Sequence, residues 1–192
     1  MTSVKRALRR AVRARRRARA EHRPDADSHE DSHEDSHQDS LAEHGLALVR
    51  SLVDPPARVS SYESWPVEPP TAALNAALVE AGYTVLVPIT RPDLDLDWAE
   101  LGAPEAPLGR EAFATVDVAL VPASGVDPEG HRLGQGGGCY DRSLPRRRAG
   151  VPVYAIVFED EVVTEPLPHD ELDQRVDGVL TPEGARRIRT PD

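Results

Sequence analysis

The chain has 192 residues, a formal net charge of −10 and a single cysteine, Cys139. This length supports one domain with a core of ordinary size, and one cysteine excludes both an internal disulfide and a multi-cysteine zinc site. No apolar run approaches membrane-spanning length, and the N-terminal segment lacks the apolar core of a signal peptide, so we expect a soluble, cytoplasmic protein. The excess of acidic residues also argues against nonspecific nucleic-acid binding by the whole molecule.

The N-terminal segment KRALRRAVRARRRAR, residues 5–19, predicts a helix. Val4, Leu8 and Val12 form a narrow apolar stripe at helical spacing, and arginines occupy the other faces. This basic surface is either simply solvated or binds an anion, such as a nucleic acid.

A repeat of Asp-Ser-His-Glu occupies residues 25–40 and has almost no apolar residues. Because it cannot bury a face against a core, we expect a mobile surface insertion at about residues 24–40. His29, His33 and His37 would share one face of a helix and could bind Zn²⁺ or Ni²⁺, although a solvated low-complexity segment is the favoured interpretation.

The remaining elements alternate between helical patterns and apolar, β-branched runs. Thr71 is the expected N-cap of one helix and Gly82 its stop, and residues 92–109, including Trp98, are expected to form a long loop. We predict helices at 41–53, 71–81 and from the glycine-rich segment to Arg148, and strands at 59–62, 84–89, 116–121, 151–158 and, last, 176–180. This pattern predicts an α/β fold: a single three-layer domain, residues 1–192, with a mostly parallel sheet flanked by helices. Ligands of such sheets bind at the carboxyl ends of the strands.

A glycine-rich segment, RLGQGGGCYDR at residues 132–142, follows one of these ends. Exposed backbone N–H groups before a helix favour an anion such as phosphate, Arg132 can add positive charge, and Asp141 can hold Mg²⁺. Neither G-x-x-x-x-G-K-[ST] nor G-x-G-x-x-G is present, which excludes a P-loop NTPase and a dinucleotide fingerprint. Tyr140 either packs on a flat ring or fills the core.

This segment closely resembles the R-L-G-R-G-x-G-Y-Y-D signature of the 5-formyltetrahydrofolate cyclo-ligases. Members of that family begin with a K-x-x-L-R helix that contacts ATP, and Lys5, Leu8 and Arg9 match it. The resemblance implies that ATP is bound by Lys5, Arg6, Ala7, Leu8, Arg9, Arg132, Leu133, Gly134, Gln135, Gly136, Gly137, Gly138, Cys139 and Tyr140. It also implies catalytic roles for Lys5, Arg132 and Gln135.

Glu68 precedes a predicted helix and is, from the sequence alone, equally well explained as a solvated acid near a positive helix end. The resemblance assigns it to the folate substrate, together with Glu63 and the loop residues 135–140.

An acidic stretch near the C-terminus contains Asp170, Glu171, Asp173 and Asp177. It is either an acidic surface loop or a source of oxygen ligands for Mg²⁺. It resembles the family pattern H-D-x-x-V-D-x-V-x-T, in which the first Asp binds metal. Ungapped register from Val176-Asp177 assigns that role to Asp173, beside Asp141, and the pair His169-Asp170 makes Asp170 the alternative.

The resemblance implies an ATP- and Mg²⁺-dependent conversion of 5-formyltetrahydrofolate, with or without a polyglutamate tail, to 5,10-methenyltetrahydrofolate, ADP and phosphate. The protein's task is to align the formyl oxygen with the γ-phosphate and to offset negative charge. Where the family has Arg and Tyr, this chain has Gln135 and Cys139. These changes leave open a noncatalytic relative that sequesters folate or nucleotide, and a basic-helix RNA-binding module is a third, disfavoured hypothesis. The expected partner is a small molecule, with no nucleic acid and no membrane, and the expected state is a monomer.

Overall fold

The computed structural model describes residues 2–21 and 33–188, which form one seven-stranded sheet in the order β3-β2-β1-β4-β5-β6-β7. The central strands are parallel, and both edge strands run antiparallel to their neighbours. The strands are β1 (Arg58–Ser60), β2 (Thr84–Thr90), β3 (Leu96–Glu100), β4 (Val118–Pro122), β5 (Val153–Ile156), β6 (Gly178–Thr181) and β7 (Gly184–Arg187). The predicted fold class, a mostly parallel sheet flanked by helices, is confirmed.

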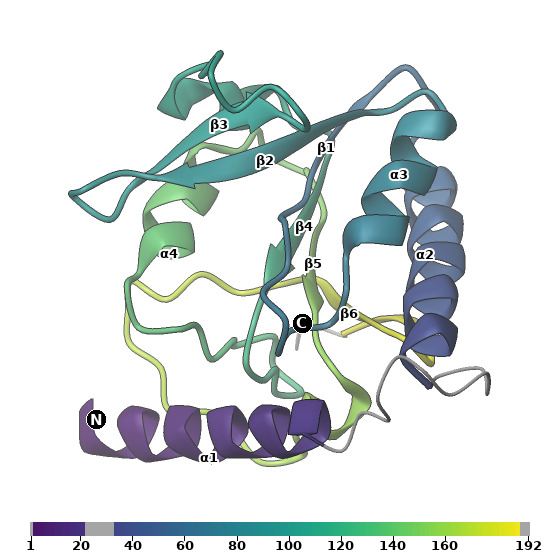
Figure 1. Cartoon of the computed structure of the whole chain (residues 1–192). Helices are drawn as coiled ribbons and strands as arrows, with labels where there is room; N and C mark the ends of the chain where they lie inside the picture. The colour runs from purple at the N-terminus through teal and green to yellow at the C-terminus, as the bar shows by residue number, and fades with distance from the viewer. Residues whose placement is uncertain (1, 22–32, 189–192) are drawn as a thin grey trace.

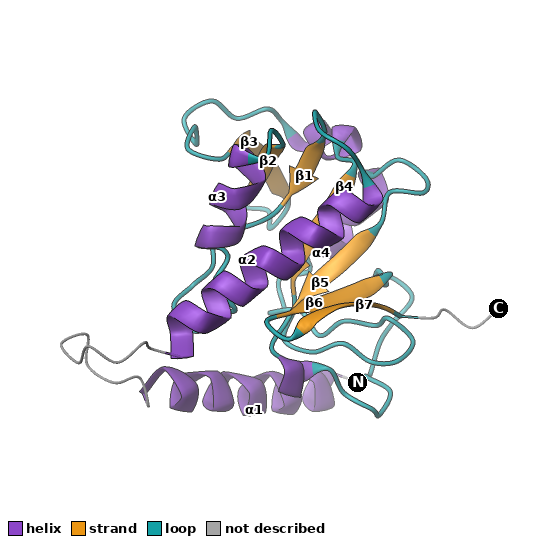
Figure 2. Ribbon diagram, turned by 90° about the vertical axis from the view of Figure 1, so that its right-hand side faces the viewer, coloured by secondary structure: helices purple, strands orange, loops and turns teal. Residues whose placement is uncertain are grey.

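Helices cover both faces of the sheet, with α2 (His33–Leu52) and α3 (Ala72–Glu80) on one side and α4 (Cys139–Ser143) on the other (Figure 1). Figure 2 shows α2 and α3 in front of the strands. Along β4, Val118 and Leu120 join the core beneath α2, while Ala119 and Val121 join the core on the α4 side. Alternating burial on two faces explains why β4 is apolar throughout.

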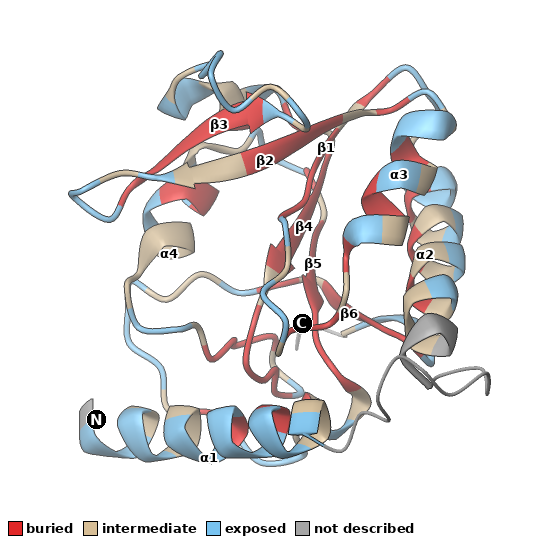
Figure 3. Cartoon of the chain, in the orientation of Figure 1, coloured by how far each residue is buried: buried red, intermediate tan, exposed pale blue. Residues whose placement is uncertain are grey.

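Helix α1 (Thr2–Glu21) lies across one edge of the sheet, below the strands in Figure 1. Most of its side chains are exposed, as Figure 3 shows. Val12 and Arg16 are the buried exceptions among its described side chains, at 7% and 3% exposed. The predicted helix is therefore present, but its inward face is partly polar.

The helix that follows the histidine-containing repeat begins earlier than the sequence predicts, at residue 33 instead of 41. Helix α2 begins at His33, so the second half of the predicted insertion forms its first turns. His29 lies outside the described residues, which leaves the proposed three-histidine face without structural description.

Two edge strands were not predicted. Residues 96–100, expected in a loop, form β3, where Trp98 is fully buried and stacks on Phe113 with ring centroids 4.7 Å apart. Aspartates are rare in strands, and Asp95 and Asp97 masked the alternating apolar pattern. The second is β7, which comes after the last predicted strand, 176–180.

Two helix predictions also need correction. Helix α4 ends at Ser143 instead of reaching Arg148, and a 3₁₀ turn at 144–146 contains Pro145, which cannot donate a helical hydrogen bond. Thr71 makes no side-chain cap for α3. Its hydroxyl instead donates to Tyr62 O at 2.6 Å and ties down the segment that leaves β1.

Candidate functional site

The site lies where the chain reverses its direction of travel across the sheet. From β1 the chain moves outward to β2 and β3, whereas from β4 it moves to β5 and β6 on the other side. Such a switch point separates the loops that leave two adjacent strands and opens a crevice at their carboxyl ends. Here those loops carry Glu68, after β1, and Gln135, after β4, which approach within 3.4 Å of each other.

A pocket of about 270 Å³ lies at the segment that follows β4. It is lined by alternate residues of the glycine loop, residues 134–138, and by cations and carboxylates that flank this loop or come from the two ends of the chain. The lining consists of Lys5, Arg9, Arg132, Leu133, Gly134, Gly136, Gly138, Asp141, Asp170 and Asp173. The structure thus gathers in one cavity most of the residues that the sequence analysis assigned to ATP and metal.

The glycine loop presents its carbonyl groups to arginines and leaves its N–H groups free. Arg9 donates to Gly134 O at 2.7 Å, and Arg142 donates to Gly137 O at 2.7 Å. Within the described ranges 2–21 and 33–188, the N–H groups of residues 134–138 donate to no protein acceptor. Because α4 is short, these free donors, more than a helix dipole, make the loop suitable for an anion.

Two of these glycines are required by geometry. Gly136 and Gly138 have φ values of 110° and 67°, which side chains rarely adopt. A Cβ atom at Gly136 would lie 3.6 Å from the guanidinium of Arg9, and one at Gly138 would lie 3.2 Å from Arg142. Backbone conformation thus favours glycine at both positions, and at Gly138 the close approach of Arg142 adds a second reason.

The lysine predicted to bind phosphate is held by the acidic stretch. Lys5 Nζ pairs with Asp170 at 3.0 Å and also with Asp173, whose carboxylate further accepts the N–H of Asp170 at 2.9 Å. Burial by itself lowers the pKa of Lys5, but these two carboxylates outweigh it and raise the pKa above its ordinary value. Lys5 is therefore fully charged at neutral pH.

Arg132 and Asp141 form the second charged pair, at 2.7 Å. Arg132 is 8% exposed, its Nε has no hydrogen-bond partner among the described residues, and burial lowers its pKa against the opposing effect of Asp141. A buried donor without a partner is costly, so this nitrogen favours an anionic ligand.

The residues of the pocket fit a nucleotide with Mg²⁺. Oδ1 of Asp141 accepts hydrogen bonds from Arg132 and from the N–H of Gln174, and Oδ2 of Asp173 accepts from Lys5 and from the N–H of Asp170. The other oxygen of each carboxylate has no partner among residues 2–21 and 33–188. No group of three or more His, Cys, Asp or Glu that could hold a metal occurs in this described part. Mg²⁺ commonly takes only one or two carboxylates and fills its remaining positions with phosphate oxygens and water.

Glu68 and Gln135 lie together at the crevice. Glu68 is 9% exposed, accepts the N–H of Trp65 at 3.1 Å and lies 3.8 Å from Arg16. The amide of Gln135 donates to Glu68 and accepts from Arg13 at 3.2 Å. Beside Glu68 the structure also buries the hydroxyl groups of Tyr62 and Tyr140, which have no hydrogen-bond partner among the described residues.

Arg13 and Arg16 were missed by the sequence analysis. Arg16 donates to Glu161 at 2.7 Å and to Ala123 O at 2.7 Å, and this buried contact holds α1 against the loops after β4 and β5. In a helix so rich in arginine, no local signal distinguishes the buried arginine from its exposed neighbours. For Arg13, the sequence offers one signal: it follows Arg9 by one helical turn and so lies on the same face of the helix.

Several predicted residues lie away from the pocket. Glu63, Arg6 and Ala7 are exposed, and Leu8 is half-buried. Glu63 has no hydrogen bond or ion pair within the described chain, unlike Glu68. The pocket therefore contains Lys5 and Arg9, Glu68 is connected to the glycine loop through Gln135, and Glu63 belongs to neither.

Cys139 and Tyr140 pack against the core on the α4 side. Tyr140 meets Trp98 edge to face at a centroid distance of 6.4 Å. Burial raises the pKa of Tyr140 strongly, so its hydroxyl stays protonated. Tyr140 thus fills the core, one of its two expected roles, while its hydroxyl end approaches the crevice.

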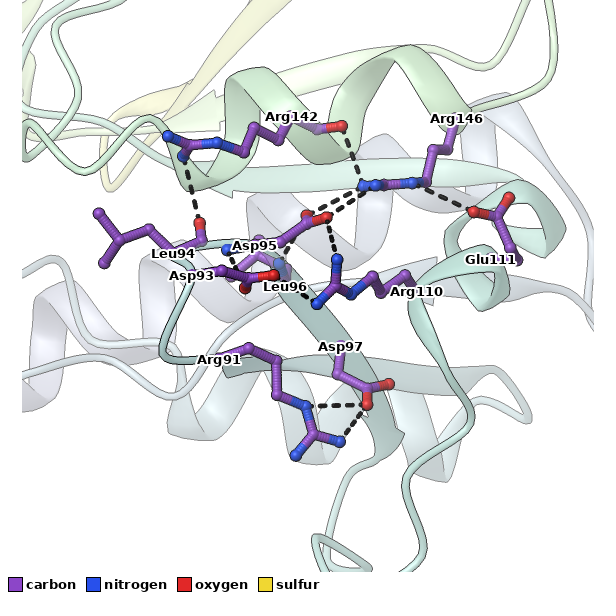
Figure 4. Close-up of polar contacts among 10 residues, drawn as sticks. All are labelled: Arg91, Asp93, Leu94, Asp95, Leu96, Asp97, Arg110, Glu111, Arg142 and Arg146. Carbon is purple, nitrogen blue, oxygen red and sulfur yellow. Dashed lines mark hydrogen bonds and ion pairs between the residues drawn. The ribbon is translucent and has the colours of Figure 1, made fainter.

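Arginines connect the β2–β3 hairpin to α4 and to the glycine loop (Figure 4). Arg142 bridges Gly137 O and Leu94 O of the hairpin turn, at 2.7 and 3.3 Å. Arg146 pairs with the buried Asp95 at 2.7 Å and donates to Arg142 O. These contacts explain why acidic residues occur in a buried edge hairpin: arginines neutralise them.

None of the helices in the described part of the chain is both long enough and apolar enough to span a membrane.

A model of the 5-formyltetrahydrofolate cyclo-ligase family matches residues 1–182. A 5-formyltetrahydrofolate cyclo-ligase from Mycolicibacterium smegmatis is 39% identical over 142 residues, which cover 65% of this chain and 73% of that protein. One from Mus musculus is 37% identical over 82 residues, or 40% of each chain.

Two solved structures share the fold. A 5,10-methenyltetrahydrofolate synthetase from Mycoplasma pneumoniae aligns with a TM-score of 0.71 and 20% identity, covering 93% of this chain and 99% of that one. One from Aquifex aeolicus aligns with a TM-score of 0.67 and 23% identity, covering 98% and 95%.

Proposed function

This chain belongs to the 5-formyltetrahydrofolate cyclo-ligase family, and on that basis we propose that it converts 5-formyltetrahydrofolate to 5,10-methenyltetrahydrofolate with consumption of ATP in the presence of Mg²⁺. The observation that carries the proposal is the glycine loop. Its unpartnered N–H groups lie between a cluster of cations on one side and Glu68 on the other. This arrangement suits a reaction that joins a phosphate donor to a second, smaller substrate.

We assign ATP to the pocket lined by Lys5, Arg9 and Arg132 and by the glycine loop. ATP supplies the phosphoryl group that turns the formyl oxygen into a leaving group, and Mg²⁺ offsets its negative charge. The N–H groups of the loop and the three cations bind and orient the phosphates in a site that is pre-formed. Asp141 and Asp173 are the proposed metal ligands.

We assign the folate substrate to the side of the loop that faces Glu68. Glu68 accepts hydrogen bonds from the substrate in this proposal, and Gln135, its neighbour, lies where the two substrates meet. Glu63 is not proposed as a contact, because it is exposed and makes no described interaction. The protein then acts on a soluble small molecule, as a cytoplasmic monomer of one domain, without nucleic-acid or membrane partners.

The test is an absorbance assay for the methenyl product with purified protein, ATP, Mg²⁺ and 5-formyltetrahydrofolate. We expect product formation that requires both ATP and Mg²⁺. The variant Lys5→Ala should lower the rate on the order of a hundredfold, because one cation that offsets phosphate charge is lost. Val4→Ala, an exposed change in the same helix, is the matched control and should retain the wild-type rate.

A second candidate function rests on Gln135, a neutral side chain that is already engaged with Glu68 and Arg13. A protein with this loop could bind folate or nucleotide without turnover and so sequester them. Tight binding of 5-formyltetrahydrofolate in calorimetry, with no methenyl product at any ATP concentration, would establish this alternative and refute the ligase.

A further inference from the structure

Lys5 and Arg16 of α1 are both paired with carboxylates. Lys5 pairs with Asp170 and Asp173, and Arg16 pairs with Glu161 at 2.7 Å. Each of these two cations therefore already shares its charge with an acidic side chain of the protein.

Arg9 and Arg13, which also contact the glycine loop, bind only neutral groups there. Arg9 donates to Gly134 O, and Arg13 donates to the main-chain and side-chain oxygens of Gln135 at 3.1 and 3.2 Å. Neither has a carboxylate partner in the part of the chain that the structure describes. Each guanidinium donates one or two N–H groups to the glycine loop. Its remaining N–H groups and its uncompensated positive charge can serve a ligand.

Arg13 acts at the boundary between the two proposed substrates. The pocket is lined by alternate loop residues, Gly134, Gly136 and Gly138, whereas the side chain of Gln135 turns to Glu68 on the other side. In the proposed reaction a phosphoryl group passes from a nucleotide in the pocket to a substrate at Glu68, and Gln135 is the loop residue whose side chain contacts Glu68. Gln135 itself offers only a neutral amide, and Arg13, which is exposed and lies outside the pocket lining, places a guanidinium 3.2 Å from that amide.

We propose that Arg13 binds the terminal phosphoryl group of ATP and supplies, from helix α1, the positive charge that the glycine loop lacks at Gln135. This inference rests on the proposed function, because it assumes ATP as the occupant of the pocket. The bidentate geometry and permanent charge of a guanidinium suit a phosphoryl group. Arg13 also orients Gln135: the amide oxygen accepts an N–H of Arg13, which turns the NH₂ group of the same amide toward Glu68.

Calorimetry with MgATP and MgADP tests the assignment without turnover. Arg13→Gln should weaken MgATP binding tenfold to about a hundredfold and leave MgADP binding within about twofold, since ADP lacks the terminal phosphoryl group. Arg17→Gln is the matched control, because Arg17 is exposed on the same helix and has no hydrogen bond or ion pair within the described residues. Equal losses for both nucleotides, or equal effects of the two variants, would overturn the proposal.

A double-mutant cycle with Gln135→Arg supplies a second test, read as the rate of methenyl formation. If Arg13 provides the charge, the rate gain from Gln135→Arg should be at least tenfold larger in the Arg13→Gln background than in the wild-type background. A similar gain in both backgrounds would contradict the proposal. If the wild type makes no methenyl product but Arg13→Gln still loses discrimination between MgATP and MgADP, the proposed function fails and the assignment of Arg13 stands.

Discussion

Glu68 and Glu63 show how two glutamates of one loop can differ in their potential for function. Glu68 is nearly buried and lies between Gln135 and Arg16, whereas Glu63 is exposed and makes no described contact. A carboxylate that is already desolvated and oriented can bind a polar substrate group at little further cost in entropy.

We expect Glu68→Gln to raise the KM for 5-formyltetrahydrofolate by tenfold or more while MgATP affinity stays within about threefold, because a charged hydrogen-bond acceptor is replaced by a neutral amide. Steady-state kinetics with each substrate varied in turn measures both effects. Glu63→Gln is the control and should match the wild type. An equal rise in KM for the two variants would show that burial at Glu68 serves only the fold.

Asp170 and Asp173 share Lys5 but differ in exposure. Their side chains are 48% and 19% exposed, and each accepts a backbone N–H in the same turn, Asp170 from Leu172 at 3.2 Å and Asp173 from Asp170 at 2.9 Å. Both belong to the wall of the pocket, so the lining alone does not decide which one binds metal.

If Asp173 is the metal ligand, Asp173→Asn should raise the Mg²⁺ concentration needed for half-maximal activity by about tenfold, and Asp170→Asn should change it by less than threefold. Each substitution removes one carboxylate from Lys5, so the two variants control for each other. A Mg²⁺ titration at saturating ATP makes the comparison, and a larger shift for Asp170→Asn would assign the metal to Asp170.

At the scale of an element, α1 is attached to the rest of the molecule through few buried side chains. Arg16 and Glu161 are 3% and 1% exposed, and this ion pair joins α1 to the loop after β5. Because α1 also carries Lys5, Arg9 and Arg13, its attachment positions several proposed nucleotide contacts at once.

Arg16→Ala leaves the Glu161 carboxylate buried and without its main partner, which should lower the free energy of unfolding by about 3–5 kcal/mol. Arg15→Ala removes an exposed pair with Asp160, at 3.7 Å, and should cost less than about 1 kcal/mol. Urea denaturation distinguishes the two. Replacing both Arg16 and Glu161 with Met should recover most of the lost free energy of unfolding. If it does not, the loss in Arg16→Ala comes from other contacts of α1 and not from the unpaired Glu161 carboxylate.

At the scale of the whole molecule, buried aspartates fix the loops at the carboxyl edge of the sheet. Asp127 is fully buried and accepts the N–H groups of Glu129, His131 and Leu167 at 2.8–2.9 Å. Burial by itself would raise the pKa of Asp127, but these hydrogen bonds outweigh it and hold the pKa below its ordinary value. The ionised carboxylate thus joins the loop after β4 to the segment that leads into the acidic stretch.

This shift predicts part of the acid unfolding. Because the folded pKa of Asp127 lies below the unfolded value of about 3.9, its contribution to stability is complete above that pH and is lost as the pH falls through the folded pKa. Asp127→Asn should therefore lower the free energy of unfolding at neutral pH and make its decline below about pH 4 shallower. Denaturation at a series of pH values measures the slope, with the exposed Asp54→Asn as control. An unchanged slope would mean that Asp127 contributes no pH-dependent stability.

The sequence by itself determined the local features whose information lies within a short stretch. The apolar run of β4 is buried on two faces, and the glycines of the loop occur where the backbone has positive φ or approaches arginines. Such patterns depend on periodicity and backbone sterics, which neighbouring residues encode. The family signature, and with it the enzyme class, was also present in this contiguous form.

Only the tertiary structure decided the arrangement of strands and the partners of charged side chains. The order of strands puts β1 beside β4, which brings Glu68 to Gln135 although they lie far apart in sequence. Strand β3 was hidden because Asp95, just before it, and Asp97, within it, look unfavourable until Arg146 and Arg91 pair with them in the folded chain. Likewise, nothing in the arginine-rich α1 marks Arg16 for burial, and the one-turn spacing from Arg9 to Arg13 does not by itself assign Arg13 to the glycine loop. Those contacts depend on which loop each side chain meets after the chain has folded.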